Sequence, residues 1–214
     1  MTRLQIAVDG LPFEGVIAVA GAVHETVDIF EVGTPVILRE GLRVVRRVKE
    51  RYPNLTVLAD TKIVDGGSAE CTDACEAGAD IVTVLGVSDD ATIRGVVDTA
   101  RRYGRKTMAD LLCVQNPVPR AKELIALGAD YICVHTPVDA QMRGASPLGE
   151  FETLLREVSP DKVAVAGGIH QANLREYLKG APAIIIMGSA LCNAPDLRQA
   201  ALQAKRLVAK GEGK

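Results

Sequence analysis

Short apolar segments rich in β-branched residues recur along the chain at intervals of roughly 25 residues. Their continuous apolarity is typical of strands that are covered on both faces, as in parallel sheets. Each interval is long enough for a loop, a helix and a return loop, which predicts repeated βα units. Eight segments are predicted as strands: Leu4–Val8, Val27–Glu31, Leu55–Ala59, Ile81–Leu85, Thr107–Leu111, Tyr131–His135, Lys162–Ala166 and Ala183–Met187.

The segments between these strands have the periodicity of amphipathic helices. Within Gly41–Arg51, charged residues cover one face, and the other face carries apolar residues at helical spacing: Leu42, Val45 and Val48. The helices predicted over 68–77 and 123–127 are followed by Gly78 and Gly128, which suit left-handed C-terminal caps. Both glycines precede Ala-Asp and then a strand, which is a weak internal repeat.

Eight βα units predict an α/β fold, a single (β/α)8 TIM barrel over residues 1–214. An open doubly wound sheet usually has fewer strands and a glycine-rich first turn, and no such turn follows Val8. No linker divides the chain, and the tail over 210–214 is expected to fray. In such a barrel the active site lies where the strands end and the βα loops begin.

Composition and charge exclude several classes of protein. The 214 residues carry a formal charge of −2 without a basic run, so no nucleic-acid partner is expected. No apolar run approaches the roughly 20 residues that cross a bilayer, and Met1–Ile6 lacks a signal-peptide layout, so we expect a cytoplasmic protein. The five cysteines suit reduced, packed thiols better than a disulfide framework, and the Cys71/Cys75 pair lacks the second pair that a zinc site needs.

Polar residues or glycines stand at almost every predicted strand end. Such residues are costly after apolar strands unless they are hydrated or paired, so their recurrence predicts a shared, ligand-facing mouth. Individually, Asp9 could simply open a turn, and Glu31 could be a solvated strand end. The set comprises Asp9, Glu31, Asp60, Lys62, Asp110, His135, Gly167–Gly168 and Gly188–Ser189.

The most concentrated charge lies at Asp60-Thr-Lys62-Ile-Val-Asp65. In a strand, Asp60 and Lys62 would project to the same face, with Asp65 just beyond the strand end. A salt bridge at the rim is the alternative interpretation, although a buried pair adds little stability because desolvation offsets the Coulomb gain. We favour an electrostatic site that holds developing negative charge.

The last two strand ends predict a phosphate site. Gly167–Gly168 and Gly188–Ser189 follow strands seven and eight, where glycines let backbone N–H groups approach a phosphate and a helix N-terminus adds its dipole. Tight βα turns would explain the same glycines without a ligand. The recurrence at both ends favours a phosphorylated substrate.

His135 and two carboxylates supply the remaining chemistry. A histidine at a barrel mouth is a natural general acid/base, although many histidines are structural. His24 and His170 lack that setting and are expected on the surface. Glu31 and Asp60 are hard ligands that suit Mg²⁺ or Mn²⁺ better than zinc.

These motifs resemble a known superfamily. Asp60-Thr-Lys62-Ile-Val-Asp65 matches the Asp-x-Lys-x-x-Asp signature of the orotidine monophosphate decarboxylase superfamily. Within it, most of the chain resembles the 3-hexulose-6-phosphate synthase family, whose near relatives are the 3-keto-L-gulonate-6-phosphate decarboxylases. The segments that carry this resemblance are Leu4–Asp9, Asp28–Pro35, Ala79–Gly86, Val134–Thr136 with Asp139 and Gln141, and Val165–Gly168.

The resemblance implies a homodimeric, Mg²⁺-dependent lyase that reversibly adds formaldehyde to D-ribulose 5-phosphate through an enediolate. It also implies roles for the residues of the mouth. Glu31 and Asp60 would hold the metal, Lys62 would face the enediolate, His135 would move the C1 proton, Asp65 would reach into the neighbouring subunit's site, Asp9 and Asp110 would hold substrate hydroxyls, and Gly168, Gly188 and Ser189 would face phosphate.

Departures from the family patterns leave alternatives open. Pro137 stands where the synthases usually have glycine, which leaves aldehyde preference open. Asp110 and Val138 side with the synthases, since the gulonate-phosphate decarboxylases carry glutamate and arginine there. Orotidine monophosphate decarboxylase is disfavoured because Ser189 follows Gly188 where that enzyme has its phosphate-binding arginine. A silent barrel that acts as a binding partner would be expected to lose a charged strand end, and none is lost.

Overall fold

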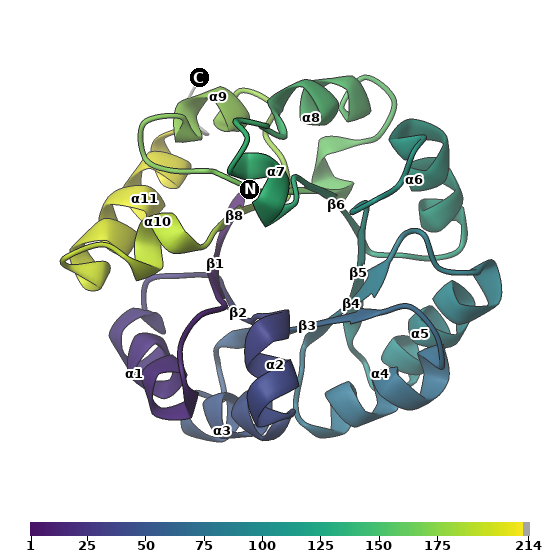
Figure 1. The fold of residues 1–214 in the computed structure, drawn as a ribbon, viewed down its shortest axis with the longest axis horizontal. Helices are drawn as coiled ribbons and strands as arrows, with labels where there is room; N and C mark the ends of the chain where they lie inside the picture. Colours follow the sequence, from purple (N-terminus) through teal and green to yellow (C-terminus); the bar gives the residue numbers. More distant parts are fainter. Residues whose placement is uncertain (212–214) are drawn as a thin grey trace.

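Eight parallel strands close into a barrel surrounded by helices, as Figure 1 shows in a view along the barrel. The computed structural model describes residues 1–211. Each strand pairs in parallel with its neighbour in the chain, and β8 pairs with β1, which confirms the predicted (β/α)8 barrel. The strands are β1 (Arg3–Val8), β2 (Ile29–Val32), β3 (Thr56–Ile63), β4 (Ile81–Leu85), β5 (Lys106–Asp110), β6 (Tyr131–His135), β7 (Val163–Ala166) and β8 (Ile184–Met187).

The helices occupy the predicted intervals with two changes. The predicted helix over 41–51 begins only at Arg43, because Gly41 has a left-handed φ of 67° and separates α2 from α3. The last helix includes Lys210 and Gly211, and the rest of the tail that was expected to fray, 212–214, lies outside the described residues. The helices are α1 (Phe13–Val23), α2 (Thr34–Glu40), α3 (Arg43–Arg51), α4 (Gly67–Glu76), α5 (Asp90–Arg102), α6 (Pro117–Ala126), α7 (Val138–Gln141), α8 (Leu148–Leu154), α9 (Leu174–Leu178), α10 (Ser189–Cys192) and α11 (Leu197–Gly211), with a 3₁₀ turn at Pro160–Lys162.

Apolar side chains fill two layers, one between strands and helices and one inside the barrel. Burying one Leu, Ile or Phe side chain contributes about 1.5–3 kcal/mol, so both layers stabilise the closed sheet. The interior below the charged strand ends is a packed core, so a ligand must approach from the mouth. The inner layer comprises Ala7, Ile29, Leu58, Ile81, Met108, Tyr131, Cys133, Ala164, Ala166, Ile184 and Ile186. Over residues 1–211, the helices lack the combination of length and apolarity that would let one cross a bilayer.

The aspartates of the Gly-Ala-Asp repeat accept backbone hydrogen bonds at the opposite end of the barrel, where the strands begin. Asp80 and Asp130, together with Asp28, each stand just before a strand and accept the backbone N–H of the preceding strand's second residue. Each bond satisfies a donor that the ladder leaves open. The donors are Leu4 (2.7 Å), Val57 (2.9 Å) and Thr107 (2.9 Å).

Candidate active site

Strand β3 carries the charged stretch and is kinked where the charges begin. The strand continues to Ile63, beyond the predicted end at Ala59, and its register against β4 shifts between these two residues. Lys62 has a left-handed φ of 48°, which costs a non-glycine residue roughly 1–2 kcal/mol. Its N–H donates to Thr83 Oγ1 at 2.9 Å, and Thr61 Oγ1 donates to the Thr83 carbonyl at 2.9 Å. Asp60 and Lys62 therefore meet through a kink and not through the regular alternation that the sequence suggested.

Lys62 is a positive charge held among carboxylates. Its Nζ forms an ion pair with Asp60 Oδ2 and lies 3.7 Å from Asp110 Oδ2. Burial alone would lower the pKa of Lys62, but Asp60 and Asp110 outweigh it and raise the pKa above its usual range. The side chain stays an ammonium ion across the physiological range and presents a fixed cation to the mouth.

His135 is oriented by Asp110. The ring Nδ1 lies 2.7 Å from Asp110 Oδ2, while Oδ1 accepts the Leu112 N–H at 2.9 Å. Burial raises the pKa of Asp110, but the bond from His135 and the nearby Lys62 charge lower it overall, so Asp110 stays ionised. An ionised Asp110 makes Nδ1 the donor and leaves Nε2 free for proton transfer. The contact with Asp110 was not expected from the sequence, and a role for Asp110 toward a substrate hydroxyl stays a prediction.

The Asp60 carboxylate is fixed by two hydroxyls that the sequence did not single out. Thr34 Oγ1 donates to Oδ2 at 2.8 Å, and Thr83 Oγ1 donates to Oδ1 at 2.9 Å. Thr83 interrupts an otherwise apolar strand at an inward position, as Gln5 does in β1. A polar residue at an inward strand position is the sequence signal that could have identified Thr83 and Gln5.

Glu31 and Asp60, the predicted metal ligands, are both buried. Burial raises the pKa of Glu31 well above its usual range, and the charges of Asp60 and Asp9 raise it further. Burial and Asp60 also raise the pKa of Asp9. Gln5 Nε2 donates to Glu31 Oε2, but Gln5 Oε1 is buried and has no hydrogen-bond partner in the described part of the chain.

This donor set fits a hard divalent cation. A cation would offset the repulsion among the carboxylates, and all the oxygens are of the kind that Mg²⁺ prefers. Within residues 1–211, no three Asp, Glu, His or Cys side chains converge as a complete metal cage. Mg²⁺ is usually held by one or two carboxylates together with substrate and water oxygens, so a complete protein cage is not required. The assignment of Glu31 and Asp60 as metal ligands stays a prediction.

The glycine ends lie at the same mouth. Gly167 has a φ of 109°, and a Cβ there would come within 2.8 Å of the Thr136 carbonyl. A Cβ on Gly188 would lie 3.9 Å from Asp9 Oδ2, which places the β8 end beside β1. Gly168 and Ser189 are exposed, so both are accessible to a ligand. The phosphate role of Gly168, Gly188 and Ser189 stays a prediction.

Comparison with known proteins identifies the family. Residues 2–204 match the model of the Orotidine 5'-phosphate decarboxylase / HUMPS family. The chain belongs to this family. It is 43% identical to the 3-hexulose-6-phosphate synthase of Bacillus subtilis, over 98% of this chain and 100% of the relative. These likenesses confirm the resemblance carried by residues 60–65, and the chain is a lyase of the 3-hexulose-6-phosphate synthase type.

Solved structures of the family give the same picture. The crystal structure of 3-hexulose-6-phosphate synthase from Salmonella typhimurium superposes with a TM-score of 0.95 at 37% identity, covering 98% of this chain and 99% of that one. A 3-keto-L-gulonate-6-phosphate decarboxylase from Vibrio cholerae superposes with a TM-score of 0.85 at 26% identity, covering 98% of both chains. The synthase is the more similar of the two in both measures.

Asp65 is the one residue of the charged signature that does not contact the other charged groups of the mouth among the ion pairs of residues 1–211. Its side chain is exposed and accepts the Gly66 N–H at 2.7 Å. Its role in a neighbouring subunit's site stays a prediction.

Of the other histidines, His170 is exposed, and His24 stacks on Tyr52 with 4.4 Å between ring centroids, so neither joins the mouth. The five cysteines are free thiols, as expected, but Cys113 is exposed, so the expectation of packed thiols is wrong at that position.

Proposed function

We propose that this lyase adds formaldehyde to D-ribulose 5-phosphate in a reversible, Mg²⁺-dependent aldol reaction that gives 3-hexulose 6-phosphate. The observation that carries the proposal is the Lys62 ammonium held between Asp60 and Asp110, next to a histidine that Asp110 orients. A fixed cation beside a proton-transfer group suits a reaction that passes through an enediolate. The names of the similar synthases support the choice of substrates.

The residues divide the chemistry as follows. His135 Nε2 takes a proton from C1 of ribulose 5-phosphate, and the electron pair left behind forms the enediolate. C1 then forms a bond to the formaldehyde carbon, and the new alkoxide takes the proton back. Lys62 stabilises the enediolate oxygens as negative charge develops, and one such contact at 4 Å is worth about 4 kcal/mol at an effective dielectric near 20. Asp110 keeps His135 in the productive tautomer.

A bound Mg²⁺, held by Glu31 and Asp60, would supply Lewis-acid stabilisation of the same oxygens. Mn²⁺ would fit the same hard ligands. Gly168, Gly188 and Ser189 would bind the phosphate, and Asp9 would hold a hydroxyl. Following the family, we place the protein in the cytoplasm as a homodimer in which Asp65 serves the partner's site, with no nucleic-acid or membrane partner.

The proposal is tested by incubating the purified protein with ribulose 5-phosphate, ¹³C-formaldehyde and Mg²⁺, and following hexulose 6-phosphate by NMR. Product that disappears with EDTA and returns with added Mg²⁺ is expected. A parallel incubation contains 3-keto-L-gulonate 6-phosphate in place of ribulose 5-phosphate and formaldehyde. If CO₂ is released there and no hexulose 6-phosphate forms in the first incubation, the decarboxylase assignment replaces ours. If an intact fold shows neither activity, the chain is a silent barrel.

A further inference from the structure

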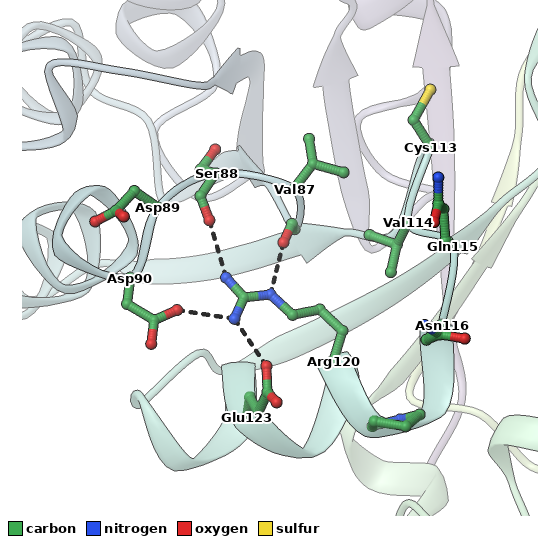
Figure 2. Close-up of a pocket in the computed structure, with 12 residues that line it drawn as sticks. Val87, Ser88, Asp89, Asp90, Cys113, Val114, Gln115, Asn116, Arg120 and Glu123 are labelled. Carbon is green, nitrogen blue, oxygen red and sulfur yellow. Dashed lines mark hydrogen bonds and ion pairs between the residues drawn. The ribbon is translucent and has the colours of Figure 1, made fainter.

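Arg120 on α6 makes four hydrogen bonds, and two of them fasten the loop after β4, residues 86–89 (Figure 2). Nε donates to the Gly86 carbonyl at 2.7 Å, and Nη2 donates to the Ser88 carbonyl at 2.9 Å. Nη1 donates to Asp90 Oδ1 at 2.8 Å and to Glu123 Oε2 at 2.9 Å. Only the planar fork of a guanidinium can reach two carbonyls and two carboxylates at once.

The ion pairs alone do not explain this arrangement. Asp90 and Glu123 are more than half exposed, and ion pairs at such positions contribute about 0–1 kcal/mol. A cavity of about 770 Å³, lined by residues 86–90 and 113–116 among others, leaves this loop without close packing on that side. Gly86 itself lies close to Val114 and Leu124, and on the side of the cavity the two carbonyl bonds from Arg120 hold the loop.

The fastened loop in turn holds the kinked end of β3. Ser88 is buried, and its Oγ donates to the Ile63 carbonyl at 3.2 Å. Ile63 follows Lys62, whose left-handed backbone is costly and is also held by Thr83 and by the ladder. At its start, the loop is also bonded to β5, because the Gly86 N–H donates to the Asp110 carbonyl at 2.7 Å.

We infer that Arg120 is a positioning residue for Lys62. The guanidinium fixes Ser88, Ser88 fixes the end of β3, and the kink at Lys62 keeps its ammonium between the two carboxylates. Arg120 touches none of the reacting groups, so its effect must pass through the loop. The kinetic part of this inference rests on the proposed function, whereas the structural part does not.

The test compares Arg120→Gln, Arg120→Lys and Ser88→Ala with a matched surface control, Arg101→Gln. Arg101 lies on the neighbouring helix α5, and its side chain is 70% exposed. Hydrogen exchange of the Lys62 amide is measured by NMR, and kcat and KM are measured in the synthase assay. We expect amide exchange about tenfold faster and kcat about tenfold lower in all three variants, with KM nearly unchanged and the control like wild type.

The Ser88→Ala/Arg120→Gln double variant should lose little more than the worse single variant, because both act along one connection. The inference is overturned if Arg120→Lys behaves as wild type, or if the single losses add in the double variant. Circular dichroism checks the fold, and if Arg120→Gln does not fold, normal amide exchange in Ser88→Ala overturns the inference by itself. An inactive wild type contradicts the proposed function only, since amide exchange still tests the connection.

Discussion

At the scale of single residues, the mouth depends on how one cation is distributed among carboxylates. Lys62 lies between Asp60 and Asp110, while Glu31 and Asp9 share their charge without a cation of their own among the ion pairs of residues 1–211. The charges of Asp60 and Asp110 are therefore balanced by a nearby cation, whereas, within the described part of the chain, the charges of Glu31 and Asp9 are not. This imbalance is the reason why we propose the Glu31 side of the mouth as the place where a divalent ion would bind.

Lys62→Ala and Asp60→Ala should reduce turnover more than His135→Asn. Lost stabilisation of about 4 kcal/mol corresponds to roughly a thousandfold in rate, whereas a positioned base contributes about 10²- to 10⁴-fold and water can replace part of it. Single-turnover rates with ribulose 5-phosphate and formaldehyde measure the difference. Equal losses, or a larger loss in His135→Asn, would contradict this order.

Glu31→Gln should stabilise the metal-free protein at pH 8 but not at pH 4. The pKa of Glu31 is raised on folding, so between the unfolded and folded pKa values the folded state binds more protons, and stability falls as pH rises through that interval. The amide removes this loss, and Tm rises by roughly 2–4 °C for each kcal/mol. Thermal unfolding in EDTA at both pH values measures the effect.

Glu152→Gln, at an exposed position of α8, is the control for that experiment and should shift Tm equally little at both pH values. Added Mg²⁺ should raise the Tm of wild type and reduce the difference in Tm between wild type and Glu31→Gln, since a ligand stabilises the state that binds it. If the Tm difference between Glu31→Gln and wild type is the same at pH 4 and pH 8, the buried carboxylate of Glu31 is not the cause of that difference.

At the scale of secondary-structure elements, the strand ends differ in what holds them. The end of β3 is kinked and is secured by side chains of Thr83 and Ser88. The end of β7 turns through two glycines with positive φ, and Gly167 is packed against Thr136. The first end presents charge and the second presents backbone. That the first serves the intermediate and the second the phosphate stays a prediction.

Gly167→Ala should destabilise the protein by about 1–3 kcal/mol, because a side chain at φ 109° is strained and its Cβ would meet the Thr136 carbonyl at 2.8 Å. Gly149→Ala in α8 is the matched control, since a Cβ there meets nothing within 4 Å. It should stabilise by about 0.5–1 kcal/mol through the unfolded chain. Urea unfolding measures both, and equal effects would show that Gly167 tolerates a side chain.

At the scale of the whole molecule, the barrel separates stability from chemistry. Apolar side chains fill the interior, three aspartates close one end, and the charged groups gather at the other. One charged residue of the signature, Asp65, leaves this mouth and points into solvent. Under the proposed homodimer, Asp65 would act in the site of the second copy of the chain.

Asp60→Ala and Asp65→Ala, each inactive alone, should regain activity when mixed and allowed to exchange subunits. In a mixed dimer one site would combine an intact Asp60 with the partner's intact Asp65, so random exchange should restore about a quarter of wild-type activity. The measurement is synthase activity after mixing, with unmixed variants carried through the same steps. No recovery despite proven exchange would exclude a site shared between subunits.

The sequence by itself determined the barrel, the strand ends that carry polar groups and the family, because these depend on local periodicity and short motifs. Only the tertiary structure decided the kink at Lys62, the bond between Asp110 and His135, the threonines that fix Asp60, and the reach of Arg120 to Ser88. These contacts join residues that are more than 20 positions apart. They depend on strand register and on backbone angles, which a period of two residues does not encode.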